Sequence, residues 1–99
     1  MLARIYQRLR PTQAGYRDAV KKGINLSEYR QVFLGVIKTS DVREVPELIS
    51  ASPKASEKCR EFRESDIVEV LAPGTHALYY LDRRRFRKLP RKFAKAVAI

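Results

Sequence analysis

Residues 65–82 read SDIVEVLAPGTHALYYLD, two apolar runs separated by a proline and a glycine. The β-branched run at 65–71 predicts a strand, and 76–82 has the composition of its hairpin partner. Between them, Pro73 stands where a type II turn needs a fixed φ, and Gly74 stands where that turn needs a positive φ. The sequence therefore predicts a β-hairpin over this stretch.

Three further segments predict strands around the hairpin. RFRKL (85–89) follows after a tight bend, and Pro90 ends the pairing because it has no N–H to donate. ARIYQRL (3–9) alternates apolar and polar residues with a period of two, and YRQVFLGVI (29–37) is rich in β-branched and aromatic residues. The hairpin is thus expected to belong to a larger sheet.

Capping residues predict two or three short helices. Thr12 offers a hydroxyl N-cap for a helix that runs to Lys22, and Gly23 is placed as its left-handed stop. VPELISAS carries Pro46 where a first helical turn tolerates proline, and SPKASEKCREF begins another turn or helix with Ser52 as its cap.

The order of these elements predicts an α+β fold for residues 1–99 as a single domain. We expect a small antiparallel sheet with a C-terminal β-meander and two or three short helices packed on one face. No segment approaches the roughly 18 consecutive apolar residues of a membrane-spanning helix, and MLARIYQRL lacks a signal-peptide pattern. Cys59 is the only cysteine, which excludes an internal disulfide and favours a reducing cytoplasm.

Positive charge is concentrated at the two ends of the chain. Residues 1–40 hold eight Lys/Arg against two Asp/Glu, residues 41–70 hold five against eight, and residues 71–99 hold eight against one. Such clustering favours contact with polyanions. The candidate binding residues are the eight C-terminal cations: Arg83, Arg84, Arg85, Arg87, Lys88, Arg91, Lys92 and Lys95.

The spacing of these cations predicts how they are presented. In a strand with Phe86 turned inward, Arg85 and Arg87 project together to solvent, and the bend residues Arg83 and Arg84 join them. Guanidinium groups match phosphate oxygens and also match carboxylates on a partner protein, so both partners stay open. If the first strand lies near the last, Arg4, Arg8 or Arg10 extends this surface.

Catalytic and metal-binding patterns are weak. His76 is alone and is expected to be an exposed turn residue, and Cys59 is expected to be a buried or half-buried thiol. Asp66 and Glu69 point to opposite faces of a strand, and Asp66 is expected to fix the start of that strand by a local backbone hydrogen bond. Of the adjacent Tyr79 and Tyr80, one faces the core. No enzyme, metal or cofactor is expected.

Three blocks of the chain resemble the YodL-like domains of bacterial mobile genetic elements. The matching residues are Tyr29, Val32, Phe33 and Gly35, then Ser65, Asp66, Ile67 and Val68, then Tyr79, Tyr80, Leu81, Asp82, Phe86, Arg87, Leu89 and Pro90. Arg85 departs from the family, which has glycine there. The resemblance implies residence on plasmids, phages or conjugative elements and a role against host defences. It implies no biochemical activity and no catalytic residue.

These observations predict a non-enzymatic, small basic binding protein in the cytoplasm of a bacterial host cell. The expected partner is nucleic acid or a nucleic-acid-bound host complex, contacted through the arginine-rich hairpin and tail. The alternative is a protein-directed inhibitor of a host defence system, of the anti-CRISPR or anti-restriction type, that contacts an acidic host protein and no nucleic acid. No membrane partner is expected.

Overall fold

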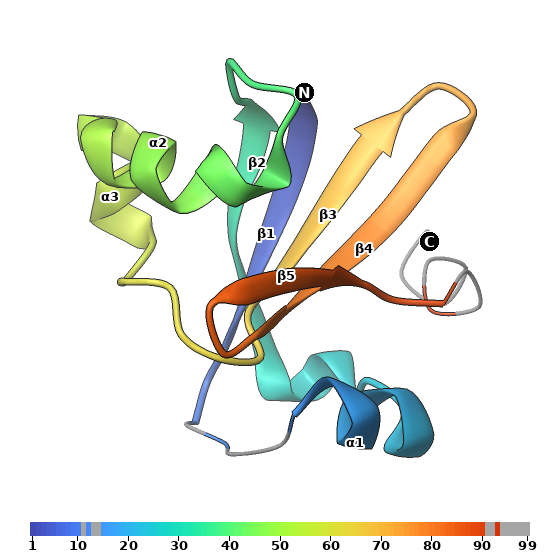
Figure 1. Cartoon of the computed structure of the whole chain (residues 1–99). Helices are drawn as coiled ribbons and strands as arrows, with labels where there is room; N and C mark the ends of the chain where they lie inside the picture. Colours follow the sequence, from blue (N-terminus) through green and yellow to red (C-terminus); the bar gives the residue numbers. More distant parts are fainter. Residues whose placement is uncertain (11, 13–14, 91–92, 94–99) are drawn as a thin grey trace.

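A five-stranded antiparallel sheet forms the centre of the computed structural model, which describes residues 1–10, 12, 15–90 and 93 (Figure 1). The strand order is β2-β1-β3-β4-β5. The α+β fold and the C-terminal β-meander are therefore confirmed. The strands are β1 (Leu2–Arg8), β2 (Tyr29–Val36), β3 (Ile67–Ala72), β4 (Thr75–Asp82) and β5 (Arg85–Lys88).

Helical segments cover both faces of this sheet. They are α1 (Tyr16–Lys22), α2 (Val45–Ala51), α3 (Pro53–Lys58) and two 3₁₀ turns, η1 (Leu26–Glu28) and η2 (Val42–Glu44). As expected, α2 and α3 share one face, where they cluster with Ile5 and Val68. Unexpectedly, α1 packs on the other face with Tyr6 and Ile67. The central strands β1 and β3 place buried apolar residues on both faces, Tyr6 and Ile67 on one and Ile5 and Val68 on the other, so each face needs a cover.

The short helices begin and end mostly as their capping residues predict. Gly23 ends α1 with φ of +87°, and Ser52 Oγ accepts from the N–H of Ala55 at 3.4 Å at the start of α3. The predicted N-cap at Thr12 is wrong, because α1 begins only after Gly15. There the first helical N–H, that of Tyr16, donates to the Asp82 carboxylate of β4 at 3.4 Å.

Two tight turns connect the meander. Gly74 has φ of +73° between β3 and β4, as the Pro-Gly pair predicts. Between β4 and β5, the pairing of Asp82 with Arg85 leaves Arg83 as the first of two turn residues, and Arg83 has φ of +60°. This is a conformation that glycine adopts without steric cost, whereas an arginine is strained in it.

A buried carboxylate joins the strands at one end of the sheet. Asp66 is fully buried and accepts two hydrogen bonds from the Arg60 guanidinium, both at 2.9 Å. It also accepts from Gln7 Nε2 at 3.2 Å, from the N–H of Arg8 at 3.2 Å and from the N–H of Arg63 at 2.9 Å. The predicted local hydrogen bond is thus present, within a network that also reaches β1.

Replacing this carboxylate should destabilise the fold strongly. Asp66→Asn turns amide hydrogens toward groups that can only donate and leaves the Arg60 charge without its partner. Loss of one member of a buried, hydrogen-bonded pair costs roughly 3–5 kcal/mol of unfolding free energy, which urea denaturation measures. Asp41→Asn is the control, because the Asp41–Arg43 pair (2.7 Å) is solvent-accessible and should leave the midpoint unchanged. A loss below about 1 kcal/mol for Asp66→Asn would contradict this role.

Replacing the strained turn residue Arg83 should, in contrast, stabilise the fold. Arg83→Gly should remove the strain of the positive φ and raise the unfolding free energy by about 0.5–1 kcal/mol. The strain energy removed exceeds the cost of glycine's extra entropy in the unfolded chain. For a chain of this length the melting temperature should rise by roughly 2–6 °C. Arg84→Gly removes the same charge at a residue without positive φ and should give no increase. Equal shifts for the two variants would show that charge, and not backbone strain, is responsible.

Candidate functional site

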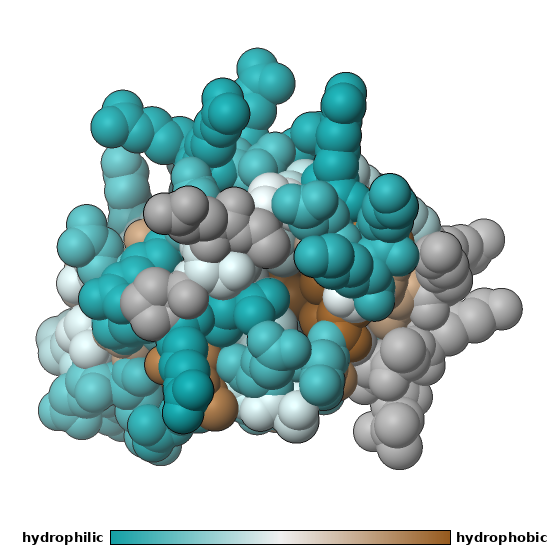
Figure 2. Space-filling view, turned by 90° about the horizontal axis from the view of Figure 1, so that it is seen from below, coloured by the Kyte–Doolittle hydropathy of each residue, from teal (hydrophilic) through white to brown (hydrophobic). Residues whose placement is uncertain are grey.

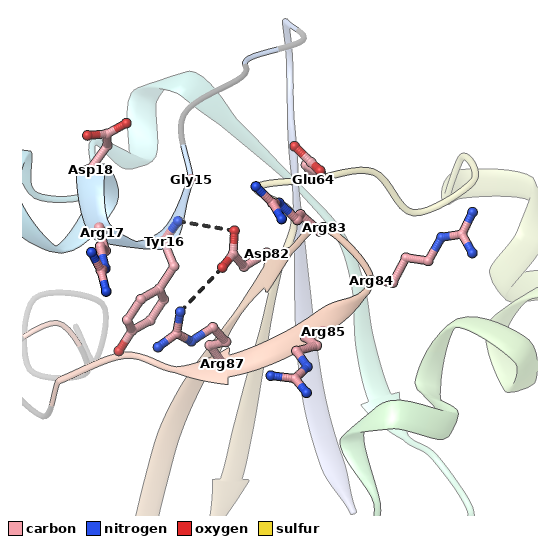
Figure 3. A pocket seen from close by; sticks show the side chains of 10 residues that line it. All are labelled: Gly15, Tyr16, Arg17, Asp18, Glu64, Asp82, Arg83, Arg84, Arg85 and Arg87. Atoms are coloured by element: carbon pink, nitrogen blue, oxygen red, sulfur yellow. Dashed lines mark hydrogen bonds and ion pairs between the residues drawn. The ribbon is translucent and has the colours of Figure 1, made fainter.

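An open cleft of about 860 Å³ lies between the start of α1 and the turn from β4 to β5 (Figure 3). Gly15 and Tyr16 form its α1 side together with Arg17. We name it the arginine cleft after its five lining arginines, Arg17, Arg83, Arg84, Arg85 and Arg87, which stand against three carboxylates, Asp18, Glu64 and Asp82. Two segments far apart in the sequence thus share one basic surface.

Asp82 stands at the centre of the cleft. One carboxylate oxygen accepts from the N–H of Tyr16 at 3.4 Å, and the other lies 3.4 Å from an Arg87 guanidinium nitrogen (Figure 3). Asp82 is the last residue of β4. Arg87 of β5 pairs with Tyr80 of β4, so the hairpin register brings the side chains of Asp82 and Arg87 together. The carboxylate therefore ties the hairpin to the start of α1.

The Arg87 guanidinium stacks on an aromatic ring. Its central carbon lies 4.2 Å from the centre of the Tyr16 ring, a cation–π contact. The Tyr16 hydroxyl donates to the carbonyl of Lys88 at 2.6 Å, and the ring meets Tyr80 edge to face at 6.3 Å. Tyr80 is fully buried, and burial raises its pKa to about 12. Tyr80 is thus the inward member of the Tyr79–Tyr80 pair.

Arg83, Arg84 and Arg85 are exposed, as the strand pattern predicts, and Phe86 turns inward to meet Phe62 edge to face. Among the described residues, only Arg87 of the five cleft arginines forms an ion pair. Figure 3 shows the Arg84 side chain directed away from Tyr16 and Arg87. The arginine cleft thus combines four guanidinium groups without an acidic partner and one that is held in place.

The remaining candidate cations are placed differently. Lys88 is exposed at the end of β5, beside the cleft and not in its lining. Arg91, Lys92 and Lys95 lie outside the described residues. Of the tail, Phe93 is buried in the cluster that contains α1, as expected for docking on the sheet.

Arg4, Arg8 and Arg10 do not line the arginine cleft, so the expected extension of the surface by these residues is not seen. In the sheet, β3 and β4 stand between β1 and β5. Arg4 instead contacts the buried Glu69 at 3.4 Å, and Arg8 pairs with Glu28 at 2.6 Å. Both guanidinium groups are therefore occupied by carboxylates of the chain itself, on the far side of the sheet's centre from the arginine cleft.

His76 and Cys59 do not come together. His76 was expected to be an exposed turn residue, but it is half-buried in β4, and its Nε2 contacts the Glu69 carboxylate. Cys59 is buried, its Sγ lies 3.7 Å from the carbonyl of Val32, and burial raises the pKa of its thiol. Within the described part of the chain, no group of three His, Cys, Asp or Glu could hold a metal ion.

Sequence reasoning missed the contribution of α1. Tyr16 and Arg17 carry no motif, and Asp82 enters only as the single acidic residue of 71–99 and as part of the YodL-like resemblance, without a role in a site. The Tyr16 ring packs against the core cluster that contains Ala19 of α1. Nothing local in the sequence indicates that this ring lies beneath an arginine more than 70 positions away.

None of the helices in the described residues is long and apolar enough to span a bilayer. Comparison of the chain with protein-family models, with curated proteins and with solved structures finds no match. The arginine cleft is therefore interpreted from its own chemistry.

Proposed function

We propose that this chain is a non-enzymatic binding protein that engages the phosphates of nucleic acid, free or in a nucleoprotein complex, through the arginine cleft. One observation carries the proposal. Four exposed arginines from two separate segments line one open cleft and have no acidic partner among the described residues. Side chains needed only for solubility require no such clustering, and guanidinium forks match phosphate oxygens in geometry and charge.

The charge of the whole chain supports a polyanionic partner. The net charge is +10, and charge of one sign on such a small protein steers polyanions toward it. Figure 2 looks at the side on which α1 and the β4–β5 turn lie, and hydrophilic side chains cover most of its described surface. A polar, open and basic surface is typical of phosphate-backbone contact and not of an enclosed small-molecule site.

The resemblance to YodL-like domains adds a biological setting to the proposal. A protein of a bacterial mobile element that acts in the host cytoplasm meets nucleic acid and nucleoprotein complexes. The alternative target is an acidic surface on a host defence protein, since guanidinium groups also pair with carboxylates. Direct binding of purified nucleic acid separates these two targets, because the alternative requires none.

Charge reversal in the cleft tests the proposal. With about four phosphate contacts, log affinity for a single strand should fall with log salt at a slope near −3, or roughly 60-fold between 50 and 200 mM. The double variant Arg84→Glu/Arg85→Glu should lose at least about 30-fold in affinity at 50 mM salt. Its slope of log affinity against log salt should be about half that of the wild type. Fluorescence anisotropy of labelled oligonucleotides measures both quantities.

A matched control keeps the total charge equal. Lys54→Glu/Lys58→Glu changes two exposed residues of α3, away from the cleft, and lowers the net charge from +10 to +6, as the cleft variant does. It should retain most of the affinity. If both double variants lose affinity equally, binding follows total charge and the cleft is not the site. If wild-type protein shifts no DNA or RNA probe at 50 mM salt, the nucleic-acid proposal fails.

A further inference from the structure

We infer that Arg87 and Tyr16 form a stacking platform for one unpaired base, so that the preferred ligand is single-stranded nucleic acid. This inference rests on the proposed function and adds the class of nucleic acid to it. Phosphate contacts alone do not distinguish single strands from duplexes, whereas a flat surface for a base does, because duplex bases are already stacked on their neighbours.

The platform is held in one orientation before any ligand binds. The Arg87 guanidinium lies 4.2 Å above the Tyr16 ring, and Asp82 contacts it at 3.4 Å. The ring is fixed in turn, because its hydroxyl donates to the Lys88 carbonyl at 2.6 Å and its edge meets Tyr80. A guanidinium held in this way loses little conformational freedom when a base stacks on it.

The Arg87 side chain is accessible from the cleft. Its guanidinium carbon lies over the Tyr16 ring, yet the side chain remains 46% exposed and lines the arginine cleft. Guanidinium planes and aromatic rings are the surfaces on which proteins stack unpaired bases. A base on the side of Arg87 away from Tyr16 would extend the pair of ring and guanidinium by one layer.

The chain contains a second arginine–tyrosine contact, but its arginine is much less accessible than Arg87. Arg8 lies 4.9 Å from the centre of the Tyr29 ring, but its side chain is only 16% exposed. Arg8 also bonds to Glu28 at 2.6 Å and to Ser65 Oγ at 3.1 Å. That guanidinium serves the fold and is mostly buried, whereas Arg87 has one carboxylate contact and a side chain that is about half exposed.

The cleft has the size and charge that a nucleotide needs. The open cleft of about 860 Å³ leaves room for one base with its sugar beside the platform. Arg83 and Arg85 precede Arg87 along the hairpin, and Arg17 lies on the α1 side. Phosphates on both sides of a stacked nucleotide would therefore meet guanidinium groups, as in single-strand binders that combine a basic groove with stacking surfaces.

The experiment compares three probes by anisotropy at one salt concentration: a labelled 12-nucleotide single strand, the same strand with abasic sites at every position, and a 12-base-pair duplex. Wild-type protein should bind the base-containing strand about tenfold more tightly than the abasic strand, which offers the same phosphates. Arg87→Lys keeps the charge but removes the planar group. It should erase this preference while changing abasic-strand and duplex affinity by no more than about twofold.

Arg85→Lys is the matched control, since it makes the same chemical change at an exposed cleft arginine that lies over no aromatic ring of the described residues. It should preserve the preference for bases. Equal wild-type affinity for the abasic and base-containing strands, or an unaltered preference in Arg87→Lys, would overturn the platform and leave phosphate binding intact. Absence of binding to all three probes at 50 mM salt would instead overturn the proposed function.

Discussion

The buried Asp66 carboxylate is the constraint on which the rest of the structure depends. A charge without exposure to water is stable only when paired and fully hydrogen-bonded, and Asp66 accepts five hydrogen bonds from Arg60 and neighbouring groups. Its backbone continues the network, since the N–H of Leu81 donates to the Asp66 carbonyl at 2.9 Å and the N–H of Ser65 donates to the Leu81 carbonyl at 2.8 Å. Asp66 thereby fixes where β4 ends, and with it the turn that follows.

This arrangement also explains why two carboxylates of the acidic middle segment leave the basic hairpin free. Asp66 is occupied by Arg60, and the buried Glu69 contacts Arg4, Tyr6 and His76. Both are used inside the molecule, so they neutralise no arginine of the cleft. Glu64 of the same segment lines the cleft, but within the described part of the chain it forms no ion pair with a cleft arginine. The hairpin therefore keeps an excess of positive charge, which is the condition for the proposed phosphate binding.

Much of the fold follows from local patterns, and the cleft follows from contacts that no local pattern contains. Alternating apolar residues and Gly74 are enough to predict the meander, because strands and type II turns depend on neighbouring residues. The coverage of both faces depends on β1 lying between β2 and β3, a long-range pairing. The contact of Asp82 with the start of α1 likewise arises only when distant segments meet. The positive φ of Arg83 is local to its turn, but an arginine there gives no sign of it in the sequence.

Asp82 might be expected to weaken a basic cleft, because it cancels one of five positive charges. Its position gives it a different effect. An exposed ion pair contributes little to stability, but this carboxylate contacts the start of α1 and Arg87 together, and so restricts a side chain that would otherwise sample many rotamers. Four arginines have no acidic partner among the described residues, while the fifth is held over the Tyr16 ring. The Asp82 carboxylate thus weakens the long-range attraction of phosphates to the cleft, but it fixes the surface that Arg87 presents. A fixed surface lets a protein prefer an unpaired base over a duplex backbone of equal charge.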